Sequence, residues 1–416
     1  MTPPAPAAGP ATHALAPAIL VLALGHVFSN AVRTLPAVAA DVLQRDLGIA
    51  ADELGAITGI FPLAFAATMV PVGVALDRYG VKPVSLVLLA ISGLGAVLAA
   101  LAPGPLGMSL AQAVLGIGCS GMLMCPMTYA GKMLSPARFG LWSGLITTTG
   151  NTGMLLSASP LAWLVEASGW RAGYWSAAAF AAFAALLVAL IVREPAPPRR
   201  DPGRDSVWAD AREVVALGLS RRLRAPVVLA LASFAVVLGV RGLWGGPWLM
   251  EVKGMSRIAA GNLLLACTVA MTVGPALAGW MARQAPGSVR ALLAGGHLVA
   301  AGLLVLLLAG GPGGPFGAFP PGLDGVLLVG FGLAIGAQVL AFPMVRAAVE
   351  PEQTGRALSA MNIAYFGGAA ALQAISGVAA AVGGIGAAIA SFILALVLCT
   401  LAFLLLSRRP DEGAHR

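Results

Sequence analysis

Long apolar segments, broken at intervals by proline, glycine or charge, recur along almost the whole chain. A membrane-spanning helix needs about 20 predominantly apolar residues, and these segments reach that length. Only 10% of the 416 residues are charged and 59% are hydrophobic, whereas a soluble chain has about a quarter of its residues charged. The pattern excludes a soluble enzyme, a nucleic-acid-binding protein and a disordered scaffold, and it makes lipid the main solvent.

The apolar segments predict an all-α integral membrane protein with 12 transmembrane helices in two pseudo-symmetric six-helix bundles. We expect the spans near residues 16–40, 53–76, 83–102, 107–131, 139–165, 172–192, 225–250, 258–281, 290–310, 323–346, 357–381 and 384–407. The predicted organisation is a tail (1–15), a bundle (16–192), a cytoplasmic linker (193–224), a second bundle (225–407) and a tail (408–416). The linker is interpreted as a tether; the alternative is a lipid-facing surface helix within 207–224.

Basic residues predict the orientation. If the N-terminus lies in the cytoplasm, the loops and tails on that side hold 19 of the 25 lysines and arginines, and the opposite side holds four. Cytoplasmic loops carry such an excess, so we expect both termini in the cytoplasm and the protein in the cytoplasmic (inner) membrane. The same asymmetry accounts for the net charge of +8 without a nucleic-acid partner. Residues 1–14 lack the basic start and cleavage site of a signal peptide.

The two predicted bundles repeat each other weakly. Arg33 and Arg241 each lie about 17 residues into the first span of a bundle, and the sequence from Gly73 to Lys82 has a shorter counterpart from Gly279 to Arg283. Transporters use such repeats to place a binding site at the midplane between halves. The 2–3 loop carries a Gly-x-x-x-Asp-Arg-x-Gly-x-Lys pattern formed by Gly73, Asp77, Arg78, Gly80 and Lys82.

With this motif, and six spans on each side of a basic loop, the chain from about 16 to 407 resembles the major facilitator superfamily. The resemblance implies a secondary transporter that rocks one bundle against the other, with the motif locking one conformation rather than binding substrate. Two features depart from the family: Gln112 stands where an arginine is frequent in the fourth helix, and the fifth span lacks the Gly-Pro signature of drug antiporters. Both departures argue against a proton-driven multidrug exporter.

Charged residues inside the predicted spans give the strongest indication of the substrate's chemical class. Arg33 and Arg241 are the only basic residues deep in the spans, and none of the 17 acidic residues lies mid-span. An arginine at the bilayer centre costs about 2.5–3.5 kcal/mol on insertion scales, so a wet cavity is the expected location. A planar guanidinium suits carboxylate or phosphate. We predict that the two arginines clamp a small organic anion, as in the superfamily's organic-phosphate and organic-anion exchangers, which the pair resembles.

The alternative is that both arginines are structural. Each could pair with backbone carbonyls, or Arg33 could extend toward Asp41 and Arg241 toward Glu251, about two helical turns away. Five further residues are predicted as secondary substrate contacts: His26, Asn30, Gln112, Trp244 and Asn362. His26, Asn30 and Arg33 form one polar stripe at helical spacing. His26 could carry a coupling proton or remain a neutral hydrogen-bonding histidine.

The predicted activity is secondary transport of a carboxylate- or phosphate-bearing organic anion, coupled to protons or to anion exchange. Efflux of a neutral or amphipathic metabolite is the main alternative; a membrane sensor and copper transport through Met122, Met124, Cys125 and Met127 are lesser ones. We expect a monomer in lipid, with no catalytic constellation, nucleotide-binding loop, structural metal site or cofactor.

Overall fold

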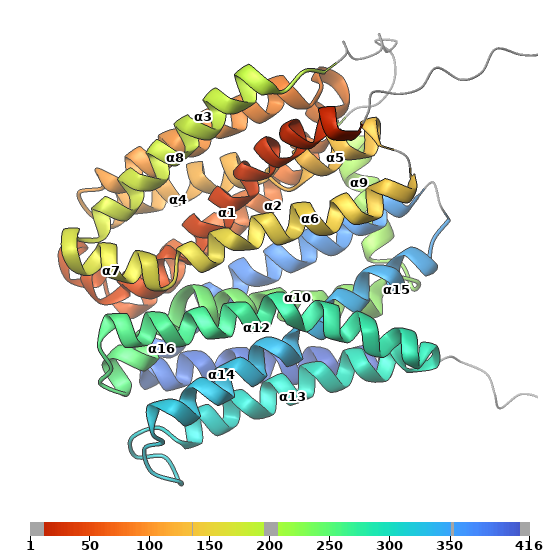
Figure 1. Ribbon diagram of the computed structural model, residues 1–416. Helices are drawn as coiled ribbons and strands as arrows, with labels where there is room; N and C mark the ends of the chain where they lie inside the picture. The colour runs from red at the N-terminus through yellow and green to blue at the C-terminus, as the bar shows by residue number, and fades with distance from the viewer. Residues whose placement is uncertain (1–11, 135, 195–206, 351–352, 408–416) are drawn as a thin grey trace, which may run out of the picture.

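The computed structural model describes residues 12–134, 136–194, 207–350 and 353–407, and these ranges are helical almost throughout (Figure 1). Helices prevail because lipid offers no hydrogen bonds to the backbone, so each spanning segment must satisfy its own. The first eight are α1 (Thr12–Leu47), α2 (Ala51–Tyr79), α3 (Val81–Ala100), α4 (Pro105–Cys119), α5 (Met124–Met133), α6 (Pro136–Leu156), α7 (Ser159–Ser168) and α8 (Trp170–Ile191).

After α9 (Val207–Gly218), the second half begins at α10. It comprises α10 (Arg224–Gly239), α11 (Gly245–Pro247), α12 (Arg257–Gln284), α13 (Val289–Ala309), α14 (Pro321–Ile335), α15 (Ala341–Ala347) and α16 (Thr354–Leu406). In Figure 1, α1–α8 form one layer and α10–α16 the other. The halves meet mainly where α2 packs on α16, α1 on the start of the second half, and α7 on α12.

Ten segments of the described chain are long and apolar enough to cross a membrane. One of them, Arg356–Leu406, has 51 residues, which at 1.5 Å per residue is more than twice the hydrocarbon thickness. It contains two non-helical glycines, Gly383 and Gly384 (φ +72°), and thus holds two spans. With those two spans and the α6–α7 segment, the described chain contains the 12 expected helices.

Glycine and proline interrupt the regular helix in two of the spans. In the span that begins with α10, two π-helical turns, Val240–Trp244 and Trp248–Val252, flank Gly245–Pro247. Between α6 and α7 the helix breaks just before Pro160, whose ring nitrogen cannot donate a hydrogen bond. Such irregular backbone inside a membrane protein occurs where protein or a cavity covers it.

The 2–3 loop is fixed by a residue that the sequence placed in the linker. Gly80 turns the chain with φ +86°, and the Glu194 carboxylate accepts hydrogen bonds from the next two backbone amides, Val81 N at 2.6 Å and Lys82 N at 3.0 Å. A Cβ at position 80 would lie 2.9 Å from Glu194 Oε2, so this close approach favours glycine. Arg78 is exposed, and the side chain of Asp77 lies outside the described residues.

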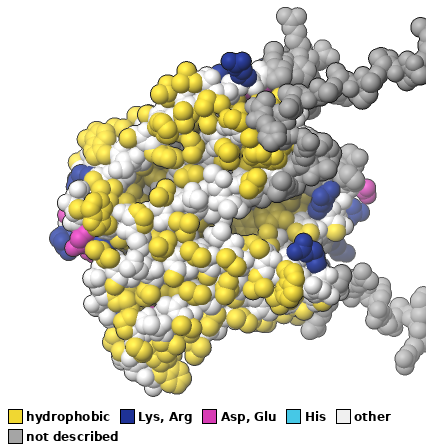
Figure 2. Space-filling view, viewed as in Figure 1, with side chains coloured by type: hydrophobic (Ala, Val, Ile, Leu, Met, Phe, Trp, Pro, Cys, Tyr) yellow, Lys and Arg dark blue, Asp and Glu magenta, His cyan; other side chains and the backbone are white. Residues whose placement is uncertain are grey.

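The surface agrees with a membrane protein. On the face in Figure 2, hydrophobic side chains cover the middle of the molecule, and most charged ones gather at its two ends. In the predicted linker, helix α9 packs against α16, where Arg356 Nη1 lies 2.6 Å from Glu213 Oε1. The predicted tails and the centre of the linker fall on residues 1–11, 195–206 and 408–416, outside the described ranges, and the domain boundaries stay predictions.

Candidate functional site

A cavity of about 240 Å³ lies between the two halves. Helices α1, α2, α4, α5 and α6 line it from one half, and α10 and α16 from the other. The lining side chains are largely apolar and aromatic, with a small polar set, which is typical of small-molecule sites. The polar set among the described residues is His26, Ser29, Asn30, Arg33, Ser120, Asn151, Asn362 and Tyr365.

Arg33 brings the positive charge into this cavity. Its Nε donates to the Ser29 carbonyl oxygen at 3.0 Å and its Nη2 to Ser29 Oγ at 2.8 Å. Side chains of a helix lean toward its N-terminus, which is why the partner lies four residues earlier. No Asp or Glu belongs to the lining among the described residues, so this half-buried cation has no carboxylate beside it in the cavity.

The stripe predicted on α1 does line the cavity. Asn30 Nδ2 donates to the Gly150 carbonyl oxygen at 2.9 Å and lies 3.4 Å from His26 Nε2. These contacts tie α1 to α6, and they occupy part of the hydrogen-bonding capacity of both side chains. His26 and Asn30 therefore take part in helix packing and also line the cavity.

Arg241 lies elsewhere. It is fully buried in the first π-helical turn and is not among the residues that line the cavity. Its Nε donates to Thr268 Oγ1 at 2.6 Å, and its Nη2 donates to the Met154 carbonyl oxygen at 2.7 Å. That carbonyl lacks its helical amide partner because Ala158 N bonds to Leu155 O at the α6–α7 break, and it also accepts from Ser157 Oγ at 3.1 Å. Arg241 thus joins the two halves, and its Nη1 has no partner among the described residues.

Of the other predicted contacts, one lines the cavity and two do not. Asn362 lines the cavity. Gln112 and Trp244 do not: Gln112 Nε2 lies 3.5 Å from the Tyr174 hydroxyl, and Trp244 Nε1 donates to Ser376 Oγ at 2.8 Å. In this conformation the structure thus brings together Arg33, His26, Asn30 and Asn362, and it places Gln112, Trp244 and Arg241 in the surrounding protein.

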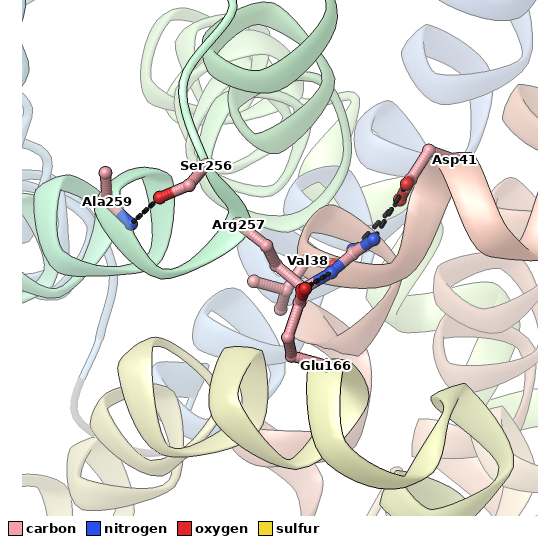
Figure 3. Close-up of polar contacts among 6 residues, drawn as sticks. All are labelled: Val38, Asp41, Glu166, Ser256, Arg257 and Ala259. Atoms are coloured by element: carbon pink, nitrogen blue, oxygen red, sulfur yellow. Dashed lines mark hydrogen bonds and ion pairs between the residues drawn. The ribbon is translucent and has the colours of Figure 1, made fainter.

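At one end of the molecule, charged groups fasten the halves together (Figure 3). Arg257, at the start of α12, contacts both oxygens of Asp41 at 2.9 and 2.7 Å and Glu166 Oε2 at 3.2 Å. Burial opposes ionisation of Asp41, but the hydrogen bonds and charge of Arg257 outweigh it and lower the pKa of this carboxyl. Asp41 is therefore ionised and paired at neutral pH. We call this the Arg257 end.

This pairing corrects one alternative from the sequence. Asp41 pairs with Arg257 rather than with Arg33. Arg241 likewise bonds to Thr268 and Met154 and not to Glu251, which is exposed. Extension toward these two acids is wrong because each arginine has a closer partner: Arg33 bonds to Ser29 one turn earlier on α1, and Arg241 bonds to residues of α6 and α12. Each arginine does donate to a backbone carbonyl, of Ser29 or of Met154, as the other structural alternative expects.

Close backbone approach completes the contact at the Arg257 end. A Cβ on Gly55 of α2 would lie 2.5 Å from the Cα of Gly377 on α16 and 2.7 Å from the Gln373 carbonyl oxygen. Ser159 Oγ donates to Asn262 Oδ1 at 2.5 Å nearby, between α7 and α12. The halves are closed at this end in the present conformation.

The aromatic part of the cavity was not predicted from the sequence. The Arg33 guanidinium lies 5.8, 5.9 and 5.7 Å from the ring centroids of Phe65, Phe234 and Phe366. In a spanning helix, the sequence does not show whether a phenylalanine lines a cavity, packs in the core or faces lipid.

Of the predicted copper ligands, Met124 lines the cavity, whereas Met122 and Cys125 are buried in the core. The described residues hold no group of three or more His, Cys, Asp or Glu arranged for a metal ion.

Comparison with known families agrees with this architecture. The profile of the Major Facilitator Superfamily matches residues 22–372, most of the chain. The chain belongs to the major facilitator superfamily. It is thus a multi-pass membrane transporter and not an enzyme, and the fold predicted from the sequence is confirmed.

Relatives within the superfamily are distant. The chain is 24% identical over 245 residues to a Bacillus subtilis (strain 168) protein named "Putative niacin/nicotinamide transporter NiaP", covering 58% of this chain and 60% of that protein. It is 27% identical over 137 residues to the "Probable sulfoacetate transporter SauU" of Cupriavidus necator (strain ATCC 17699 / DSM 428 / KCTC 22496 / NCIMB 10442 / H16 / Stanier 337), covering 33% and 32%. These matches therefore span less than two thirds of either relative.

Solved structures of the superfamily superpose over nearly the whole chain. A mutant of the nucleoside transporter NupG has a TM-score of 0.74 at 15% identity, covering 95% of this chain and 100% of that one. A bacterial homologue of the human lysosomal transporter Spinster, in an inward-facing and occupied conformation, has a TM-score of 0.72 at 16% identity, covering 97% and 99%. At such identities the similarity shows the shared fold.

Proposed function

We propose that this transporter moves a small organic anion by alternating access, and that Arg33 binds the anion. The observation that carries the proposal is the position of Arg33 in the cavity between the halves, without a carboxylate among the described lining residues. A cation in such a site attracts an anion from solution, and binding from both halves would draw them together. His26, Asn30 and Asn362 are proposed as secondary contacts because they line the same cavity.

The proposed role of Arg241 differs from the clamp expected from the sequence. In this conformation its guanidinium donates to the carbonyl oxygen of Met154, a residue of the cavity wall, and to Thr268 Oγ1, while Arg241 itself is not among the lining residues. We therefore place the anion at Arg33 and assign Arg241 to fastening the halves. A two-arginine clamp would require Arg241 to exchange these partners in another conformation, and it stays a prediction.

The names of the relatives support an anionic substrate. Niacin and sulfoacetate both carry a carboxylate, whereas nicotinamide, the other compound in the first relative's name, is an uncharged amide. With both termini in the cytoplasm, as the basic residues predict, the closed Arg257 end would face outward and the cavity would serve the inward-facing state. Coupling by protons or by anion exchange remains part of the proposal, with His26 as the proton-carrying candidate in the cavity.

A thermal-shift screen tests the proposal. Purified protein in detergent is heated with acetate, benzoate, phosphate, chloride, choline or Cu(I). A ligand that binds only the folded protein raises the unfolding free energy by about 2.7 kcal/mol at 100 times its Kd, so the Tm rises. We expect stabilisation by organic anions that disappears in Arg33→Ala. Stabilisation by choline or Cu(I) alone, or anion stabilisation that survives Arg33→Ala, would contradict the proposal.

A further inference from the structure

Three phenylalanine rings surround the guanidinium of Arg33. Phe65 comes from α2, Phe234 from α10 and Phe366 from α16, and each ring centroid lies within 6 Å of Arg33 Cζ. Cations are attracted to ring faces at such distances. We propose that the anion is an aromatic monocarboxylate, with its carboxylate on Arg33 and its ring among these phenylalanines. The inference rests on the proposed function and narrows it to one substrate class.

The charge of the cavity favours a monoanion. Among the described lining residues, Arg33 is the only lysine or arginine, because Arg241 lies outside the lining. A phosphate monoester carries close to two negative charges at neutral pH, and one arginine in an apolar cavity leaves the second charge uncompensated. A carboxylate carries one charge and matches two donors of the planar guanidinium. This separates carboxylates from the phosphates that the sequence left open.

Arg33 has donors to spare for that carboxylate. Its bonds among the described residues go only to Ser29, from Nε and from Nη2. Arginine has five N–H donors, so both donors of Nη1 and the second donor of Nη2 remain. Arg33 is half-buried rather than enclosed, and it belongs to the cavity wall.

The packing of the three phenylalanine rings favours a substrate with a planar ring. Phe65 and Phe366 stack at 3.8 Å between centroids, with their planes 18° apart, and they belong to opposite halves. Phe234 meets Phe366 edge to face at 5.0 Å. When the halves separate, the two stacked rings lose each other's faces. A planar substrate ring restores such a stack in either half, whereas a saturated ring of similar size cannot.

Two amides mark the polar part of the cavity. Asn151 and Asn362 line it from opposite halves, and neither has a hydrogen-bond partner among the described residues. An amide offers both donors and an acceptor. These side chains suit a hydroxyl, amino or ring-nitrogen substituent on the aromatic ring, or the second carboxylate oxygen.

Calorimetric titration of the purified full chain tests the inference with three matched probes: benzoate, cyclohexanecarboxylate and benzamide. Benzoate and cyclohexanecarboxylate share charge and approximate size, and benzamide keeps the ring without the charge. We expect benzoate to bind about tenfold more tightly than cyclohexanecarboxylate, since aromatic pairs add to area burial, and benzamide to bind at least as weakly as cyclohexanecarboxylate.

Variants separate the ring effect from general damage. Phe234→Leu should bring the Kd values of benzoate and cyclohexanecarboxylate to within about twofold of each other. Phe234→Tyr, which keeps the ring, should preserve the discrimination. Phe183→Leu is the matched control because Phe183 is exposed on α8, outside the cavity lining.

The outcomes distinguish a failure of the aromatic substrate class from a failure of the proposed anion site. Equal, Arg33-dependent binding of benzoate and cyclohexanecarboxylate would overturn the aromatic class and leave the anion site standing. Tighter binding of phosphate than of benzoate would overturn the monocarboxylate. Absence of binding by every anion, or anion binding that persists in Arg33→Gln, would overturn both the inference and the proposed function.

Discussion

Replacing Arg33 by glutamine should abolish most transport of carboxylates. Removing one partner of a desolvated, hydrogen-bonded charge pair costs about 2–5 kcal/mol, which corresponds to a loss of affinity of roughly 30-fold or more. Arg33→Lys should also lose at least about tenfold, because lysine keeps the charge but not the planar fork. The measurement is uptake of radiolabelled benzoate and acetate by proteoliposomes that contain the wild type or either variant.

A control variant outside the cavity tests whether the loss of uptake is specific to Arg33. Arg222→Gln removes an exposed arginine outside the cavity and should leave uptake unchanged. If the substrate is a neutral or amphipathic metabolite and both arginines are structural, Arg33→Lys and Arg241→Lys should retain activity. Retained uptake in folded Arg33→Lys would therefore favour that alternative over the anion site.

Gly55→Ala should shift the protein away from the conformation that is closed at the Arg257 end. The new Cβ would lie 2.5 Å from Gly377 Cα and 2.7 Å from a backbone oxygen, and backbone atoms cannot move aside as a flexible side chain can. Overpacking of this kind costs typically 1–3 kcal/mol, or about a 5- to 150-fold change in the ratio of closed to open conformations. Transport needs both conformations, so the rate should fall.

Spin labels can measure this shift directly. Positions Arg45 on α1 and Ile258 on α12 are exposed at the Arg257 end, on opposite halves. With the native cysteines replaced by alanine, the distance between labels at Arg45→Cys and Ile258→Cys should increase in Gly55→Ala. Gly302→Ala is the control because its added Cβ would meet no atom within 4 Å apart from the adjacent backbone of its own helix. An unchanged distance distribution in Gly55→Ala would show that this contact does not limit closure.

Much of the fold could be predicted because lipid constrains it so strongly. Segment length and apolar composition place the spans, and the predicted division between residues 381 and 384 falls at the break of α16. Gly245, Gly246 and Pro247 are weak helix formers, and in the structure two π-helical turns flank them. These signals are local, so one sequence suffices to read them.

The site was harder to predict because the depth of a residue in a span does not determine whether its side chain faces the cavity or a neighbouring helix. Arg33 and Arg241 lie at matching depths, but the π-helical turn that contains Arg241 alters the register of its helix and its partners lie on α6 and α12. The pair of Arg257 and Asp41 is 216 residues apart in sequence. Such contacts depend on packing between helices, which helical periodicity within one segment does not contain.

The most direct measurement of the anion site is a crystal structure of the protein with 4-bromobenzoate, in which the anomalous signal of bromine locates the ring. We expect a bromine peak in the cavity lined by Phe65, Phe234 and Phe366, with a carboxylate oxygen about 2.7–2.9 Å from a guanidinium nitrogen of Arg33. A bound ligand whose carboxylate contacts other groups, with Arg33 bonded only to Ser29, would contradict it.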